Sequence, residues 1–162
     1  MTRCDLNLGF IGLGAIGLPM AANLCRSGFR LNVHTRSRSA QRAAELKGAR
    51  SCANPAEAAD AVDVLLICVS DDQAVETVLF GSDGAASTMR PGSVVVDCST
   101  IAPATAMACA KRLAQQGIHY LDAPVTGGTE GAKAGTLTLL VGGESTAVAC
   151  VRPVLEVIGS TI

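Results

Sequence analysis

The sequence is short of aromatic and charged residues. It has no tryptophan, one tyrosine and three phenylalanines among 162 residues, and charged residues make up only 17%. Hydrophobic residues make up 49%. This balance excludes an intrinsically disordered chain. It predicts about one folded domain, with a core of Ala, Val, Leu and Ile to which Phe10, Phe29, Phe80 and Tyr120 add the whole aromatic content.

The sequence also lacks a Cys-x-x-Cys pair. Its seven cysteines, an odd number, stand at positions 4, 25, 52, 68, 98, 109 and 150. This spacing argues against a metal site or a disulfide framework. A thiol within an apolar run, such as Cys68, packs as a small hydrophobic group. We therefore expect no metal, and a protein of the reducing cytoplasm.

Neither a large net charge nor a long apolar run is present. The formal net charge is −1, which gives no electrostatic reason for binding nucleic acid or an anionic membrane surface. The apolar stretch near the N-terminus is too short for a signal peptide or a transmembrane helix. We expect neither nucleic acid nor a membrane as a partner.

Short apolar segments and amphipathic segments alternate along the chain. Strands are expected over residues 6–11, 31–34, 62–69, 94–97 and 118–121, and helices over 15–27, 39–46, 71–79 and 103–116. This alternation predicts an α/β fold with a doubly wound, mostly parallel sheet. A glycine- and threonine-rich stretch (126–135), a strand (137–141) and a helix (145–158) follow, and residues 160–162 look like the start of another strand.

A glycine fingerprint joins the first expected strand to the first expected helix. It reads Gly12-Leu13-Gly14-Ala15-Ile16-Gly17. In a Rossmann dinucleotide-binding domain the first glycine makes a tight turn, the second admits the pyrophosphate and the third allows close packing of helix and strand. The alternative is a plain glycine-rich turn in a protein with 17 glycines. The strand–turn–helix context favours the dinucleotide site.

Basic and hydroxyl side chains follow the second expected strand. The chain there reads His34-Thr35-Arg36-Ser37-Arg38, and no acidic residue occurs from position 28 to 41. NAD-binding domains place an acid here for the ribose 2′-hydroxyl, whereas an arginine accommodates the 2′-phosphate of NADP. Arg36 and Ser37 therefore predict a preference for NADP(H) over NAD(H), with Arg38 adding charge. The alternative is a solvated basic loop.

Three segments together resemble the β-hydroxyacid dehydrogenase family, which includes 3-hydroxyisobutyrate dehydrogenase, tartronate semialdehyde reductase and 6-phosphogluconate dehydrogenase. The first segment spans residues 9–24 and includes the fingerprint and Pro19. The second is Asp97-Cys98-Ser99-Thr100, and the third runs from Asp122 to Ala132. The resemblance covers nearly the whole chain and implies a Rossmann domain of a hydride-transferring enzyme.

The resemblance implies further site residues. Val69 and Ser70, at the end of the strand expected over 62–69, would line the adenosine side of the cofactor, and Thr100 would lie by the nicotinamide ribose. Thr126, Gly127 and Gly128 would hold the substrate carboxylate. A hydroxyl followed by two glycines also offers converging donors to an anion, although a plain turn is the alternative. Thr126 departs from the family's usual serine.

The resemblance also implies a reaction between a nicotinamide cofactor and a small β-hydroxyacid or its aldehyde or keto counterpart. The family's general acid/base is a lysine in a Gly-x-x-x-Lys-x-x-x-Asn motif on a later helix. The three lysines present, Lys47, Lys111 and Lys133, lack that setting. We therefore expect residues 1–162 to be the dinucleotide-binding domain, with the catalytic lysine beyond Ile162. The family's helical domain would be absent, and the isolated chain inactive.

Two other functions are alternatives to this interpretation. A stand-alone, non-catalytic NADP(H)-binding module would bind cofactor without turnover. A methyltransferase could use the same glycine turn for S-adenosylmethionine, but it would need an acid at the end of the second strand, and Arg36 argues against it. Homo-oligomerisation is expected only of the complete protein, because the helical domain usually forms the dimer in the family.

Overall fold

The computed structural model describes residues 6–37 and 46–162. Six parallel strands form the main sheet in the order β3-β2-β1-β4-β5-β6. These strands are β1 (Asn7–Ile11), β2 (Arg30–His34), β3 (Ala49–Ser51), β4 (Val64–Ile67), β5 (Val94–Asp97) and β6 (His119–Asp122). The doubly wound, mostly parallel sheet predicted from the sequence is therefore confirmed, with the strand order typical of a Rossmann domain.

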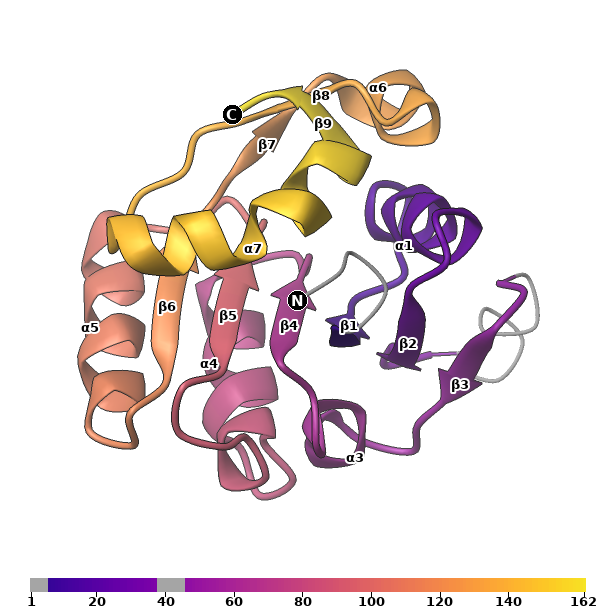
Figure 1. Ribbon diagram of the computed structural model, residues 1–162. Helices are drawn as coiled ribbons and strands as arrows, with labels where there is room; N and C mark the ends of the chain where they lie inside the picture. The colour runs from indigo at the N-terminus through magenta and orange to yellow at the C-terminus, as the bar shows by residue number, and fades with distance from the viewer. Residues whose placement is uncertain (1–5, 38–45) are drawn as a thin grey trace.

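Helices cover both faces of this sheet (Figure 1). On one face, α1 (Gly17–Arg26) and α7 (Ser145–Ile158) pack on the side chains of Phe10, Leu66 and Val96. On the other face lie α3 (Pro55–Ala59), α4 (Asp72–Phe80), the short 3-10 helix η1 (Ala85–Ser87) and α5 (Pro103–Ala114). Strands β4 and β5 are buried along their whole length, as expected for strands covered on both faces.

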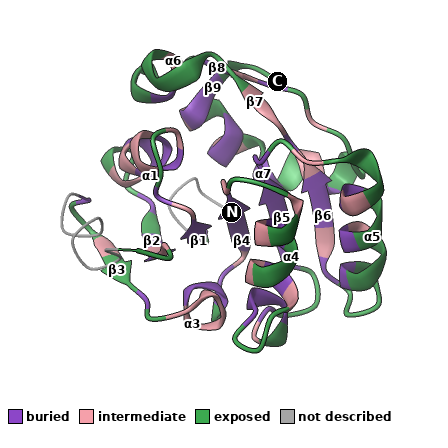
Figure 2. Cartoon of the chain, turned by 180° about the vertical axis from the view of Figure 1, so that it is seen from behind, coloured by how far each residue is buried: buried purple, intermediate pink, exposed green. Residues whose placement is uncertain are grey.

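Burial follows the layers: in Figure 2, which shows the chain from behind, the central strands of the main sheet are mainly buried and much of α4 and α5 is exposed. In the part of the chain that the structure describes, no helix has the length and apolar character needed to cross a membrane.

A second, small sheet follows the main one. It contains β7 (Val125–Thr126), β8 (Leu137–Leu139) and β9 (Gly159–Thr161), and α6 (Gly128–Ala134) lies between β7 and β8. Strand β7 pairs antiparallel with β8, and β9 pairs parallel with β8. The last residues thus form a short paired strand, and the helix expected over 145–158 is confirmed at both ends.

Some expected boundaries were wrong. The strand expected over 62–69 is only Val64–Ile67, and the helix expected from residue 15 begins at Gly17. Strand β3 and helices α3 and η1 were not predicted, because segments of three to five residues are too short to show a periodic pattern. The helix expected over 39–46 lies, except for its last residue, outside the described residues.

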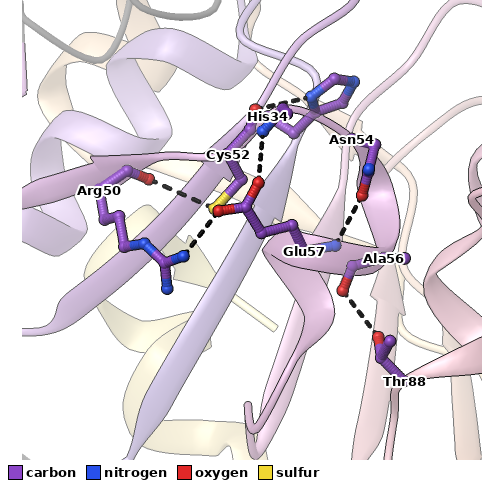
Figure 3. Close-up of polar contacts among 8 residues, drawn as sticks. His34, Arg50, Cys52, Asn54, Ala56, Glu57 and Thr88 are labelled. Carbon is purple, nitrogen blue, oxygen red and sulfur yellow. Dashed lines mark hydrogen bonds and ion pairs between the residues drawn. The ribbon is translucent and has the colours of Figure 1, made fainter.

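Helix α3 begins with a polar cap that sequence analysis overlooked (Figure 3). The backbone N–H of Glu57 donates to Asn54 Oδ1 at 2.8 Å, and Glu57 Oε2 accepts from the N–H of Ala53 at 2.8 Å. This reciprocal arrangement resembles a capping box, with Pro55 at the first helical position. Glu57 also pairs with Arg50 on β3 at 2.6 Å. The cap therefore ties α3 to the edge of the sheet.

The Glu57 cap predicts a pH-dependent contribution to stability. The hydrogen bond from Ala53, followed by the charge of Arg50, lowers the pKa of Glu57 below its usual 4.5. Because Glu57 has a lower pKa in the folded chain than in the unfolded chain, its charged form stabilises the fold above pH 4.5. This stabilisation is lost as the pH falls through the lowered pKa. Glu57→Gln should therefore lower the melting temperature at pH 7. The difference from the parent chain should shrink below pH 4.5; a difference that grows on acidification would contradict this assignment.

Candidate dinucleotide-binding site

The glycine fingerprint lies at the carboxyl end of the main sheet. At this point the chain leaves β1 toward β2 on one side and leaves β4 toward β5 on the other. Gly12 adopts a φ of +100°, and its N–H donates to the carbonyl of His34 at 2.9 Å. A Cβ atom on Gly12 would lie 2.1 Å from the carbonyl oxygen of Cys68, and one on Gly17 would lie 1.9 Å from that of Gly12. These two glycines are required by the packing of the turn itself.

Gly14 differs from its two neighbours in the fingerprint. A Cβ atom there would meet nothing within 4 Å, and the residue is exposed. The carbonyl of Gly14 accepts the N–H of Leu18 at 3.0 Å, so the turn runs directly into α1. The first N–H groups of a helix have no partner within it and favour an anion, and the first turn of α1 contains no acid. The open space at Gly14 therefore fits a phosphate group.

The remaining fingerprint residues differ in how far their side chains are buried. Leu13 is buried in the core, whereas Ala15 is exposed and Ile16 packs partly against the core at the N-cap position of α1. The residues between the strand and the helix therefore form a turn whose side chains leave the space before Gly14 open.

Arg36 and Ser37 are both exposed just after β2, at the same end of the sheet as the fingerprint. Arg38 lies outside the described residues. Sequence analysis missed an acid near Arg36. This acid is Asp71, which lies in the loop after β4, and the charge of Arg36 contributes to lowering its pKa. The larger causes are hydrogen bonds from the Ser70 hydroxyl and from the N–H of Ala74. No local sequence window could have paired residues 36 and 71.

Val69 and Ser70 lie in the loop after β4 rather than on the strand, because β4 ends at Ile67. The N–H of Val69 donates to Ser99 Oγ at 3.0 Å. The hydroxyl of Ser70 donates to Asp71 Oδ2 at 2.7 Å, and Asp71 Oδ1 caps α4 by accepting the N–H of Ala74 at 2.8 Å. Hydrogen bonds therefore fix this loop on both sides.

Thr100 is exposed in the loop after β5, one strand further from Arg36. The last residue of β5 before this loop is Asp97, which is fully buried. Its carboxylate accepts the N–H of Ser99 at 2.9 Å and the hydroxyl of Tyr120 at 2.8 Å. Burial raises the pKa of Asp97 and, more strongly, that of Tyr120. Further along, the N–H of Ala102 donates to Asp72 Oδ1 at 2.9 Å.

The segment Thr126-Gly127-Gly128 joins β7 to α6, which begins at Gly128. Thr126 is exposed on β7, and both glycines have positive φ, of 128° and 62°. A Cβ atom on Gly128 would meet nothing within 4 Å, whereas one on Gly127 would lie 3.2 Å from Leu137. Of these two glycines, Gly128 therefore has open space beside it, whereas Gly127 packs against Leu137 of the small sheet.

Asn23 connects this segment to the fingerprint helix. Its side chain is 8% exposed, and Nδ2 donates to the carbonyl of Ala132 on α6 at 2.8 Å. The guanidinium of Arg26 donates to Asn23 Oδ1. Helix α1 therefore carries the glycine turn at one end and supports α6 from its buried face.

Two further kinds of site, a metal cluster and a lysine beside the Gly127-Gly128 turn, can be examined in the described residues. Residues 6–37 and 46–162 contain no group of three or more His, Cys, Asp or Glu side chains placed to hold a metal ion. Lys133, the lysine nearest the Gly127-Gly128 turn in sequence, is exposed and pairs with Glu130 on the same helix at 2.9 Å. This ion pair supports the interpretation of Lys133 as a surface residue.

The parallel sheet with strand order 3-2-1-4-5-6 and the open glycine turn at its switch point define a Rossmann dinucleotide-binding domain. The family model described as the NAD binding domain of 6-phosphogluconate dehydrogenase matches residues 7–162. The chain therefore belongs to this family and, with the dehydrogenases and reductases it resembles, to the β-hydroxyacid dehydrogenases. The domain that it matches is one that binds a pyridine nucleotide, and its named relatives are dehydrogenases and reductases.

Three relatives illustrate the range of the family. The chain is 41% identical to 2-(hydroxymethyl)glutarate dehydrogenase of Eubacterium barkeri and 40% identical to NAD-dependent L-serine dehydrogenase of Pseudomonas aeruginosa. These alignments cover 98% and 96% of this chain and 52% of each relative. The solved structure of Psf3 in complex with NADP⁺ and 2-OPP superposes with a TM-score of 0.88 at 39% identity, covering 95% of this chain and 55% of Psf3. The chain thus spans about half the length of the curated relatives it matches.

The contrast between Gly14 and Gly17 predicts two different mutant phenotypes. Gly14→Val should leave the chain folded but abolish binding of NADPH and NADH, because the new side chain would occupy the open space before the turn. Gly17→Ala should instead destabilise the fold, because its Cβ would overlap the Gly12 carbonyl. Circular dichroism with calorimetric titration separates the two. A Gly14→Val variant that still binds would show that the phosphates lie elsewhere.

Proposed function

We propose that the chain binds NADP(H) in preference to NAD(H), at the carboxyl end of the main sheet. The observation that carries this proposal is the pair Arg36 and Ser37, exposed at the end of β2 without an acid on that strand or directly after it. A guanidinium can donate two parallel hydrogen bonds to a phosphate, and a neighbouring hydroxyl can add a third. The fingerprint residues Gly12 to Gly17 hold the pyrophosphate, and Val69 and Ser70 flank the adenosine.

Asp71 lies near Arg36 and is an acid that could oppose this preference. Both of its carboxylate oxygens already accept hydrogen bonds, from the Ser70 hydroxyl and the Ala74 N–H. Asp71 is thus held as the cap of α4, with part of its acceptor capacity already used. The preference must come from this chain's own residues, because one relative is named as NAD-dependent and another was solved with NADP⁺.

Calorimetric titration tests the cofactor preference. NADPH should bind more tightly than NADH, and Arg36→Ala should weaken NADPH binding selectively by about 1.5–3 kcal/mol, the range for hydrogen bonds to charged groups. Arg30→Ala is a matched control, because Arg30 is exposed at the opposite end of β2. Equal affinity for the two cofactors in the parent chain would refute the preference. An equal loss for both in Arg36→Ala would point to stacking on the adenine instead.

We further propose that the whole protein transfers a hydride between NADP(H) and a small β-hydroxyacid or its aldehyde or keto counterpart. Thr126, Gly127 and Gly128 bind the substrate carboxylate, and Thr100 lies beside the nicotinamide ribose. The open space at Gly128 and the two positive φ angles support this role, since successive backbone N–H groups in such a turn converge on an anion. The described cysteines are free thiols, which supports the proposed cytoplasmic location.

We propose that the general acid/base of this reaction lies outside residues 1–162. We propose the same for the surface through which the whole protein forms a homo-oligomer. The 162-residue chain assayed with NADP⁺ and a panel of small hydroxyacids, L-serine and 3-hydroxyisobutyrate included, should therefore bind cofactor but show no measurable turnover. A positioned general base typically contributes about 10²–10⁴-fold to the rate. Turnover by this chain that Lys133→Met abolishes would overturn the assignment and give Lys133 the role of base.

A further inference from the structure

The loops that follow β4 and β5 are joined to each other by two hydrogen bonds. The N–H of Val69 in the first loop donates to Ser99 Oγ in the second, at 3.0 Å. The N–H of Ala102 in the second loop donates to Asp72 Oδ1, at the start of α4, at 2.9 Å. The segments 69–72 and 99–102 are therefore held together at both ends, with Thr100 between the two bonds.

Ser99 is the junction of this arrangement, and Asp97 fixes it. Ser99 is 2% exposed, and its backbone N–H donates to Asp97 Oδ1 at 2.9 Å. The other oxygen of Asp97 accepts the Tyr120 hydroxyl from the neighbouring strand β6 at 2.8 Å. The side chain of Ser99 also hydrogen-bonds to Asp97, and its oxygen accepts the Val69 N–H, so these two contacts fix the orientation of the hydroxyl. Ser99 itself is buried from any ligand.

A carboxylate at position 97 is costly to the fold. Asp97 is fully buried, and its hydrogen-bond partners are a serine and a tyrosine rather than a cation. Burying such a group without a counter-charge is unfavourable, and apolar residues often replace buried charges without loss of stability. Stability alone therefore does not explain why a carboxylate is placed at position 97. Its role in holding Ser99, and with it the loop after β5, does explain it.

The position of the two loops in the sheet relates each of them to a part of the dinucleotide. Strands β2, β1, β4 and β5 are consecutive neighbours. With the 2′-phosphate at Arg36 after β2 and the pyrophosphate at the fingerprint after β1, the loop after β4 flanks the adenosine through Val69 and Ser70. The loop after β5, which contains Thr100, then lies beside the nicotinamide ribose.

We propose that Ser99, held by Asp97, is the positioning residue for the nicotinamide half of the cofactor. It acts through the adjacent Thr100, and the proposal rests on the proposed NADP(H) site. Removing the Ser99 hydroxyl leaves the Val69 N–H without its partner and releases the loop after β5, with Thr100, from the loop after β4. The 2′-phosphate at Arg36 and the 5′-phosphate at the fingerprint are held by other residues, and these are left unchanged.

The experiment compares two nucleotides on the same chain. NADPH contains both halves of the cofactor, whereas adenosine 2′,5′-bisphosphate lacks the nicotinamide half. Ser99→Ala should weaken NADPH binding by about tenfold, a typical loss for one unsatisfied buried hydrogen-bonding group, and leave the affinity for adenosine 2′,5′-bisphosphate within about twofold. The change in nicotinamide fluorescence when NADPH binds should be reduced, and Ser99→Thr, which keeps the hydroxyl, should restore both signals.

Ser93→Ala is the matched control. Ser93 is also a buried serine beside β5, at its other end, and its hydroxyl donates to the carbonyl of Arg90 at 2.7 Å. It should lower stability without changing the ratio of the two affinities. If Ser99→Ala does not fold, Tyr120→Phe removes the bond to the second oxygen of Asp97, and it should shift the ratio in the same direction.

The outcomes separate the two proposals. A parent chain that binds neither NADPH nor adenosine 2′,5′-bisphosphate would refute the proposed NADP(H) site itself. A parent chain that binds both, with a Ser99→Ala variant whose affinities are unchanged or fall equally, would refute the positioning role alone. The same holds if Tyr120→Phe, used in its place, leaves the ratio unchanged.

Discussion

The close approach of two backbone segments at the glycine turn is the constraint on which the rest of the structure depends. Gly12 lies against the carbonyl of Cys68, and Gly17 lies against the carbonyl of Gly12, at distances that no Cβ atom could share. This approach brings the N-terminus of α1 directly over the ends of β1 and β4. Because Gly14 does not take part in this packing, the turn keeps an open space at the point where the helix dipole and its N–H groups converge.

The sequence alone was enough to predict the architecture and most of the central elements. Continuous apolar runs identified β4 and β5, and the fingerprint located the turn between β1 and α1 correctly. Element ends were less accurate, because the apolar run of 62–69 includes Cys68 and Val69, which belong to the loop above the sheet. The polar cap at Asn54 and Glu57 was visible in the sequence as Asn-Pro-x-Glu, although the five-residue helix behind it was too short to predict.

The contacts that organise the site were beyond sequence analysis for a physical reason. Asp71 approaches Arg36, Tyr120 binds Asp97, and Asn23 binds the backbone of Ala132, and each pair joins residues far apart in the chain. The first two pairs exist because the parallel strands and the loops after them lie side by side, and the third exists because α1 and α6 pack together. A local pattern can identify an exposed arginine or a buried aspartate-containing strand end, but it cannot show which side chain will lie beside it.

The hydrogen bond from Asn23 to Ala132 has a consequence for how the domain folds. It joins residues 109 positions apart, and closing so long a loop costs conformational entropy before any contact compensates for it. Contacts between sequence neighbours, such as those of β1, α1 and β2, do not face this delay. The α6 region should therefore dock late, onto a sheet that is already assembled, and it should be among the first parts to open in the native state. The end of the domain that holds the Gly127-Gly128 turn is thus the one whose order depends most on a completed fold.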